Sequence, residues 1–442
     1  GGDVEAGPAN DLRVTALLER GVQEAGTLDQ DPLVQAELYE TLGDIYQKLG
    51  SLDQADKLLN LALERRRALA SGIPDTLVAL GLLRVDQAKL DDAERLIREG
   101  LDRNRQLLPP GHPSIAAAMD ALGRVLQEKG EYAKAIPVLQ EAVKLRSAVS
   151  GSSAELAGSL YELANAKFYA GEYKEAEALN QRVLAMTRRL YGERHPRVAE
   201  TLVNLGAIQQ DLGNYKEAER FHRRALVITR GFYGENHYRT AANLTMVARA
   251  LVFQRRLDEA EVLLRQALSV QERTFGPVHP RVASALNEVG NVALMRKQYD
   301  EARKAFQRMA DIYRSVYAGK HYLIGTAISN VGSVYMAERE NERAEALFRE
   351  ALAMFTQTLA PDHLNIAIAR IKLGRTLLRQ KRYNEAERET SAGSTILLKQ
   401  VNPSVSWLNS ARTDLAEIYD AQHQPQKAAE LRKEMAAMAA TK

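Results

Sequence analysis

Histidine is the residue of this sequence whose spacing first suggests chemistry. Five histidines stand 42 residues apart and a sixth precedes them in a similar context: His195, His237, His279, His321 and His363, with His112 before them. Imidazole is a frequent metal ligand and a frequent general acid or base. A regular series of histidines could therefore hold metal ions, touch a ligand, or serve the fold itself.

Distance argues against a metal ion shared between these histidines. A Zn–N bond is about 2.0–2.1 Å long, so two histidines on one ion must nearly touch. Histidines in successive structural repeats are separated by packed helices, by about 10 Å or more. Proline favours the first turn of a helix, and it follows three of the histidines, as Pro113, Pro196 and Pro280. We therefore expect the histidines to lie in loops that cap and pack the start of the next helix, with metal binding and ligand contact as the alternatives.

No catalytic motif accompanies the histidines. The sequence lacks a glycine-rich dinucleotide fingerprint, a phosphate loop, HExxH, GxSxG and the kinase signatures HRD and DFG. Cysteine is absent, which excludes disulfides, thiolate metal sites and thiol catalysis. The paired acids Asp91 and Asp92 stand where a helix is expected to begin, and there they face its N-terminal dipole. We therefore predict a chain without an active site, a cofactor or a metal.

Charge and hydropathy exclude two further classes of site. The net charge is +3 over 442 residues, and the basic runs are short and lie among acids. A nucleic-acid reader normally clusters its basic residues, so we expect no nucleic-acid partner. No apolar run approaches the roughly 18–20 residues that a membrane span needs. The chain begins with glycine and shows no signal peptide, and we interpret it as a piece of a longer protein, in which a span could lie upstream. The sequence leaves the cellular location and homo-oligomerisation open.

A second and stricter periodicity defines the elements that carry the histidines. A small residue recurs, mostly every 42 residues, at Gly43, Gly81, Gly123, Ala164, Gly206, Ala248, Gly290, Gly332, Gly374 and Ala416. An alanine follows each of them twelve residues later, at Ala55, Ala93, Ala135, Ala176, Ala218, Ala260, Ala302, Ala344, Ala386 and Ala428. Two helices approach closely only where side chains are small, so both series predict helix–helix contacts.

Each period is predicted to form two helices. Apolar residues recur at the helical period in 198–212, and the pattern resumes in 215–232 after a turn at 211–214. We predict an all-α fold, a right-handed α-solenoid or superhelix of about ten helix–turn–helix units. Residues 1–11 are expected to form a disordered or extended tail, and residues 12–35 a leading helix and linker. The solenoid is expected over 36–438, in repeats at about 36–69, 74–108, 114–149, 155–190, 197–232, 239–274, 281–316, 323–358, 365–400 and 404–438.

This register resembles the tetratricopeptide repeat. Gly206, Ala218 and Ala225 stand at the small positions of that family's consensus. The usual tetratricopeptide period is about 34 residues, whereas this chain uses 42, a variant similar to the repeats of kinesin light chains. The resemblance implies a superhelix that binds a peptide or protein segment on the inner face formed by its first helices.

Residues 10–50 carry a second resemblance. The stretches "LRVTALLERG", "LDQDPLVQAELYETLG" and "YQKLGSLDQADKLL" are similar to the region that joins a membrane span to tetratricopeptide repeats in bacterial, especially acidobacterial, serine/threonine protein kinases. That resemblance implies a kinase domain and a membrane helix upstream, and it makes this chain the sensory or scaffolding arm of the kinase. Every residue that would carry kinase chemistry is missing from the chain itself.

The resemblance also implies which residues line the inner face. They stand three before, and one, four and five after, the recurring small residue, and we select Tyr161, Asn165, Phe168, Tyr169, Thr245, Arg249, Val252, Phe253, Asn287, Asn291, Leu294, Met295, Ser329, Met336, Arg375, Leu378 and Arg379. Apolar residues in such a concavity usually mark a binding site. Asparagine can bond a peptide backbone through its amide, and arginine can hold a carboxylate. Packing of some of these side chains against a neighbouring repeat is the alternative.

Together these features predict a non-catalytic scaffold that binds a protein or peptide in the groove of its first helices. A free-standing cytoplasmic adaptor of the kinesin-light-chain type is the first alternative. An enzyme or metal-binding protein that uses the loop histidines is the second.

Overall fold

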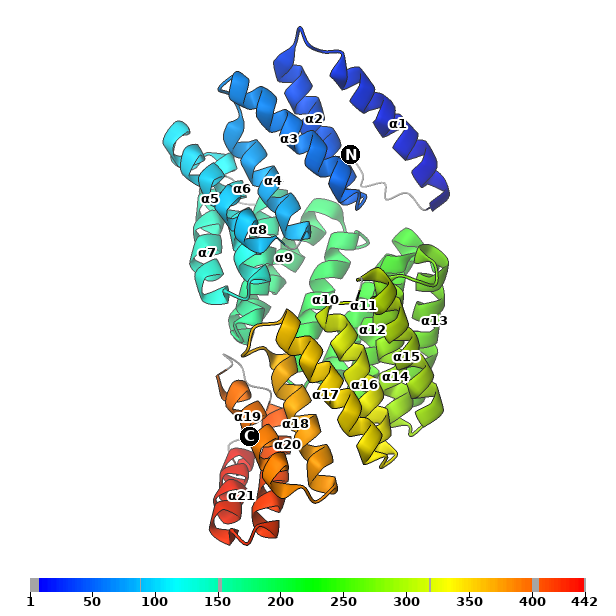
Figure 1. Cartoon of the computed structure of the whole chain (residues 1–442). Helices are drawn as coiled ribbons and strands as arrows, with labels where there is room; N and C mark the ends of the chain where they lie inside the picture. The colour runs from blue at the N-terminus through cyan, green and yellow to red at the C-terminus, as the bar shows by residue number, and fades with distance from the viewer. Residues whose placement is uncertain (1–7, 88, 150–152, 318, 400–404, 441–442) are drawn as a thin grey trace. The chain divides into compact units, whose positions relative to one another are not determined.

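The computed structural model describes residues 8–87, 89–149, 153–317, 319–399 and 405–440, and these residues form only α-helices and connecting turns. The helices are α1 (Pro8–Gly26), α2 (Pro32–Lys48), α3 (Leu52–Ala68), α4 (Ile73–Asp86), α5 (Leu90–Leu107), α6 (Pro113–Glu128), α7 (Tyr132–Val149), α8 (Ala154–Tyr169), α9 (Tyr173–Tyr191), α10 (Pro196–Asp211), α11 (Tyr215–Tyr233), α12 (Tyr238–Phe253), α13 (Leu257–Phe275), α14 (Pro280–Met295), α15 (Tyr299–Val316), α16 (Tyr322–Ala337), α17 (Asn341–Thr358), α18 (Leu364–Arg379), α19 (Tyr383–Leu398), α20 (Val405–Ala421) and α21 (Pro425–Ala440) (Figure 1). The fold is an all-α repeat solenoid, as the sequence predicts.

The first helix begins inside the span that was predicted as a tail. Residues 1–7 of that span lie outside the described residues, and residues 8–11 are helical. Helix α1 packs against α2, where the Gln35 side-chain amide donates a hydrogen bond to the Ala25 carbonyl at 2.9 Å. Ala25 and Gln35 are both fully buried, so the leading helix covers the open side of the first repeat.

The chain divides into two compact units, Gly1–Phe232 and Tyr233–Lys442, which we call unit 1 and unit 2. In both units an even-numbered first helix pairs with the odd-numbered second helix that follows it. Successive first helices also contact one another directly, as α4 contacts α6 and α18 contacts α20. Each unit therefore presents a continuous layer of first helices, whose surface we call the first-helix face.

The recurring small residues lie where the two helices of a repeat touch. All ten alanines of the second series are fully buried: Ala55, Ala93, Ala135, Ala176, Ala218, Ala260, Ala302, Ala344, Ala386 and Ala428. A Cβ atom added at Gly290 would lie 2.6 Å from a ring carbon of Phe306, and one at Gly332 would lie 2.9 Å from Phe348. Glycine is therefore required at these positions by the large residue opposite, sixteen positions further along the chain.

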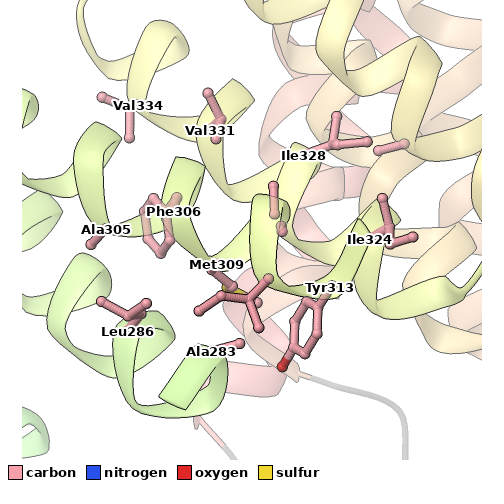
Figure 2. Close-up of a cluster of buried hydrophobic side chains, with 14 of the residues drawn as sticks. Ala283, Leu286, Ala305, Phe306, Met309, Tyr313, Ile324, Ile328, Val331 and Val334 are labelled. Atoms are coloured by element: carbon pink, nitrogen blue, oxygen red, sulfur yellow. The ribbon is translucent and has the colours of Figure 1, made fainter. Parts of the chain in front are cut away.

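The core of unit 2 shows how neighbouring repeats share their apolar side chains. Leu286 of α14, Phe306 and Met309 of α15 and Ile328 of α16 lie in one buried cluster (Figure 2). This continuity means that each repeat completes the core of the next, which is how a solenoid is stabilised without a single central core.

Candidate functional site

All six recurring histidines cap the helix that follows them. In each case Nδ1 accepts a hydrogen bond from the backbone N–H two residues further on, over 3.2 Å at Ser114, Arg197, Arg239 and Leu323 and 3.1 Å at Arg281 and Asn365. These bonds satisfy one of the N–H groups that the first turn of a helix leaves unpaired. The predicted capping role of the histidines is confirmed.

The imidazoles of His195, His237, His279 and His321 also stack on an aromatic residue at the end of the preceding helix. The ring centroids of His237 and Tyr233 are 4.4 Å apart, and those of His321 and Tyr317 are 4.0 Å apart, with nearly parallel planes. Burial lowers the pKa of His279, His321 and His363. At His363 the nearby Asp362 carboxylate acts in the opposite direction, but its effect is smaller than that of burial. Burial thus favours the neutral ring, the form whose Nδ1 can accept a hydrogen bond. Among the described residues no group of three or more His, Asp or Glu is arranged to hold a metal ion.

The predicted inner-face residues divide by depth. Thr245, Ser329 and Leu378 are buried, and the Thr245 hydroxyl donates back to the Ala241 carbonyl at 3.2 Å. Most of the others are half-buried: Tyr161, Asn165, Phe168, Arg249, Val252, Asn287, Asn291, Leu294, Met336 and Arg375. The exposed members are Tyr169, Phe253, Met295 and Arg379.

Five polar members of this set have a partner at a position that the sequence reasoning missed: Asn165, Arg249, Asn287, Ser329 and Arg375. It lies two residues before the recurring small residue and reaches back to the preceding repeat. Asn204 donates to Asn165 at 2.7 Å, and Asn330 donates to Asn287 at 2.7 Å. Glu288, Asp414 and Lys372 occupy the same position and contact Arg249, Arg375 and Ser329. We call these pairs, one in unit 1 and four in unit 2, the polar ladder of the two first-helix faces. The 42-residue spacing would have revealed them had the position two residues before the small residue been considered.

The ladder changes what the predicted arginines can do. Arg249 is paired with Glu288 at 2.6 Å, and Arg375 with Asp414 at 2.9 Å, so each carboxylate site is filled from within the chain. Arg379 instead donates to the Met336 carbonyl at 2.6 Å. A carboxylate ligand would therefore have to displace an internal partner from either of the first two arginines.

Unit 1 holds a hollow on its first-helix face. It has a volume of about 470 Å³ and is lined by Arg124, Gln127, Glu128, Tyr132, Glu162, Asn165 and Tyr169. Tyr169 stacks on Tyr132 with ring centroids 5.5 Å apart, and the edge of Phe168 meets Tyr169 at 5.1 Å. Burial, with the charges of Asp120 and Glu128, raises the pKa of Glu162. The hollow thus combines an exposed aromatic surface with a carboxylate that its surroundings leave incompletely compensated.

Comparison with protein families decides what kind of repeat this is. Tetratricopeptide repeat models match residues 36–69, 72–148, 155–230, 198–273, 240–315 and 323–388. The chain belongs to the tetratricopeptide repeat family. Repeats of this family indicate a protein-binding scaffold, and the fold is of a generally non-catalytic kind. A search of curated proteins gives no match.

Solved tetratricopeptide repeat and solenoid structures resemble parts or most of the chain. A putative kinesin light chain repeat protein of Podosopora anserina is 22% identical, with a TM-score of 0.42, and the match covers 47% of this chain and 98% of that one. The apo form of RapI is 14% identical with a TM-score of 0.56, covering 82% and 98%. The apo quorum sensor NprR of B. thuringiensis is 13% identical with a TM-score of 0.55, covering 87% and 99%.

Within the described residues, contacts inside the chain account for most of the side chains that the sequence singled out. Helix caps use the histidines, and interrepeat pairs use most of the polar first-helix side chains. Tyr169, Phe253 and Met295 are large apolar side chains of the first-helix faces that remain exposed to solvent. No helix in the described ranges has both the length and the apolar character that crossing a bilayer requires.

Proposed function

We propose that this tetratricopeptide repeat chain is a non-catalytic scaffold that binds a segment of a partner protein on its first-helix face. One observation carries the proposal. Tyr169, Phe253 and Met295 all stand five residues after the recurring small residue, and they are 56%, 50% and 39% exposed. Each unit therefore carries large exposed apolar side chains at this position of its own first-helix face, Tyr169 in unit 1 and Phe253 and Met295 in unit 2. Exposed apolar side chains gathered on a face usually mark a binding surface.

The polar ladder supports the same function. Amide pairs such as Asn165–Asn204 keep donors and acceptors fixed along the face, where an extended backbone could add to them. Since these side chains are already held by their partners, little side-chain entropy would be lost on binding.

The experiment that tests the proposal begins with selection from a random dodecapeptide display library on the purified chain. Selected peptides are then titrated by fluorescence anisotropy against Phe253→Ser and Met295→Ser. Truncation of a buried apolar contact costs over about 1 kcal/mol at an interface centre, so we expect about tenfold weaker binding. Val262→Ser is the matched control, because Val262 is 67% exposed but lies on the second helix α13. Equal losses in all three variants, or no selected peptide, would contradict the proposal.

We further propose that the scaffold is the interaction arm of a bacterial serine/threonine kinase. The support is the resemblance of residues 10–50 to the segment between the membrane span and the repeats of such kinases. Helix α1, which packs onto α2, would then continue the link into the solenoid. The coding sequence upstream of Gly1 tests this: a kinase domain followed by an apolar span is expected, and their absence would favour the free-standing adaptor.

A further inference from the structure

In unit 2 a row of basic residues lies in the turns between the two helices of each repeat. Their backbone φ is positive, a conformation that is unfavourable for any residue with a side chain. The position lies seven residues after the recurring small residue, in the turn between the two helices of a repeat. In unit 2 it is held by Arg255, Lys297, Arg339, Lys381 and His423, with φ of 62°, 62°, 66°, 62° and 59°. In unit 1 the same position with positive φ is held by Gly50, Gly130, Gly171 and Gly213. We call Arg255, Lys297, Arg339 and Lys381 the turn ridge.

The turn ridge has a conformational cost that glycine would avoid. A side chain in the left-handed region costs roughly 1–2 kcal/mol, and glycine is the usual residue just past a helix C-terminus. Conformations of this kind tend to collect at functional sites. Four successive repeats carry a long basic side chain at the costly position, so the charge itself is the feature that requires an explanation.

The charges of the turn ridge are not used inside the chain. All four side chains are exposed, and within the described residues none of them has a carboxylate partner. Neighbouring bases differ, because Arg296 pairs with Glu261 at 2.9 Å and Arg382 with Glu345 at 2.8 Å. Burial lowers the pKa of Arg379 and the nearby Arg375 and Arg339 lower it further, while Asp414 and Glu417 oppose them. The turn ridge itself therefore carries positive charge that is not paired with a carboxylate of the described residues.

The turn ridge also adjoins the apolar part of the first-helix face. Phe253 and Met295 stand two residues before Arg255 and Lys297, at the ends of α12 and α14. A partner lying along this edge would meet an apolar contact and a cation at each of these repeats.

We propose that the turn ridge binds an extended partner segment in which acidic residues alternate with apolar ones. This inference rests on the proposed scaffold function and names the chemistry of its partner. The first helices of unit 2 contact one another, as α12 contacts α14 and α16 contacts α18, so successive ridge residues are about 8–10 Å apart. An extended chain rises about 3.3 Å per residue. An acid at every third residue would therefore meet each ridge residue in turn.

The test uses a fluorescein-labelled peptide of five Asp-Ser-Leu units and the purified full chain. Fluorescence anisotropy is compared for the wild type and for the variant Lys297→Gly, Arg339→Gly, Lys381→Gly. Loss of three exposed charge contacts is expected to weaken binding about tenfold. The melting temperature of the variant should not fall, because glycine relieves the backbone. The control carries Lys304→Gln, Lys320→Gln and Lys433→Gln, which remove three exposed charges away from the ridge and should leave binding unchanged.

Three other outcomes would each contradict part of the proposal. Equal binding by the ridge variant and the wild type would remove the turn ridge as the site. Equal binding of a peptide with its aspartates moved to one end would remove the spacing. Ridge-dependent binding of phosphatidylserine vesicles without peptide binding would assign the ridge to a lipid surface. In all three cases library peptides that remain sensitive to Phe253→Ser would leave the proposed scaffold function standing.

Discussion

Units 1 and 2 share one architecture but differ in the charge that their first-helix faces leave uncompensated. Burial raises the pKa of the unit 1 carboxyl groups Asp44, Asp120, Glu162 and Asp211. In unit 2 burial raises the pKa of the Asp414 carboxyl in the same way, but it also lowers the pKa of Lys372 to about 8 and lowers that of Arg379. Acids outnumber bases over 1–232 and bases outnumber acids over 233–442. The contacts between helices determine the fold of both units. Residues at equivalent positions of the two first-helix faces are not needed for those contacts, so they can carry opposite charge.

The largest expected effects concern the contacts that the two units share. Phe306→Ala should cost about 3–5 kcal/mol of unfolding free energy, because a fully buried ring leaves a cavity. Gly290→Ala should cost about 1–3 kcal/mol through overpacking against Phe306. The double variant Gly290→Ala, Phe306→Leu should lose less unfolding free energy than the sum of the losses in the single variants Gly290→Ala and Phe306→Leu. The double variant recreates the buried pair Ala248 and Leu264. Urea unfolding followed by circular dichroism gives the values.

A control for this cycle lies in unit 1. Gly158 in α8 has no atom within 4 Å of its would-be Cβ. Gly158→Ala should therefore raise stability by up to about 1 kcal/mol, since alanine has the higher helix propensity. Strict additivity in the unit 2 cycle would show that Gly290 does not meet Phe306.

The sequence could reveal these contacts because they repeat. Both small-residue series, the two-helix period and the capping histidines follow from spacing, and the structure confirms them. The depth of individual first-helix residues could not be read in this way. Thr245 and Ser329 are buried, and Ser329 accepts a hydrogen bond from Lys372 of the next repeat. A shift of one residue along a helix turns the side chain by about 100°, so the repeat spacing alone does not fix burial. The residues that form the polar ladder were missed for the same reason. The turn ridge could not be recognised from the sequence, because its distinguishing feature is the positive backbone φ of its residues.

The second prediction compares the stability contributions of two lysines, Lys129 of unit 1, which two carboxylates hold, and Lys372 of unit 2. The Lys372 amine donates a hydrogen bond to the Ser329 hydroxyl at 3.2 Å and lies beside the rings of Phe348 and Trp407, and within the described residues no carboxylate pairs with it. Its pKa falls from 10.5 to about 8 in the folded chain, so the folded state binds fewer protons between these values and stability rises with pH across that window. The stabilising gain on alkalisation is at most about 3 kcal/mol.

Replacement of the two lysines sharpens this contrast. Lys372→Met should raise the unfolding free energy at pH 7 by about 1–3 kcal/mol and abolish the rise toward pH 10. Lys129→Met should instead lower it by no more than about 1 kcal/mol, because Lys129 is held by Asp91 at 2.8 Å and Glu94 at 2.7 Å at the surface. Urea unfolding at pH 7 and pH 10 measures both. A loss of stability in Lys372→Met would mean that the buried amine is better compensated than its contacts indicate.

The third prediction concerns the histidine caps of unit 2. The folded pKa of His279, His321 and His363 is below 6.5, so their neutral form contributes stability that is present above pH 6.5 and lost as pH falls through the folded pKa. Each cap is worth about 0.5–2 kcal/mol. Changing all three to Asn, which also caps helices, should flatten the difference in stability between pH 7.5 and pH 5. The same acid sensitivity in the Asn variant would assign it to carboxyl groups.

The smallest expected effect exchanges the turn residues of the two units. Lys297→Gly in unit 2 should raise the unfolding free energy by up to about 1 kcal/mol, because glycine takes the φ of 62° without strain. Gly213→Lys in unit 1, where φ is 82°, should lower it by a similar amount. Urea unfolding of the two single variants measures both signs. If Lys297→Gly lowered stability, the lysine would be held by the C-terminal dipole of α14 more strongly than its backbone resists it. The turn ridge would then be a helix cap, and its charge would need no partner to explain it.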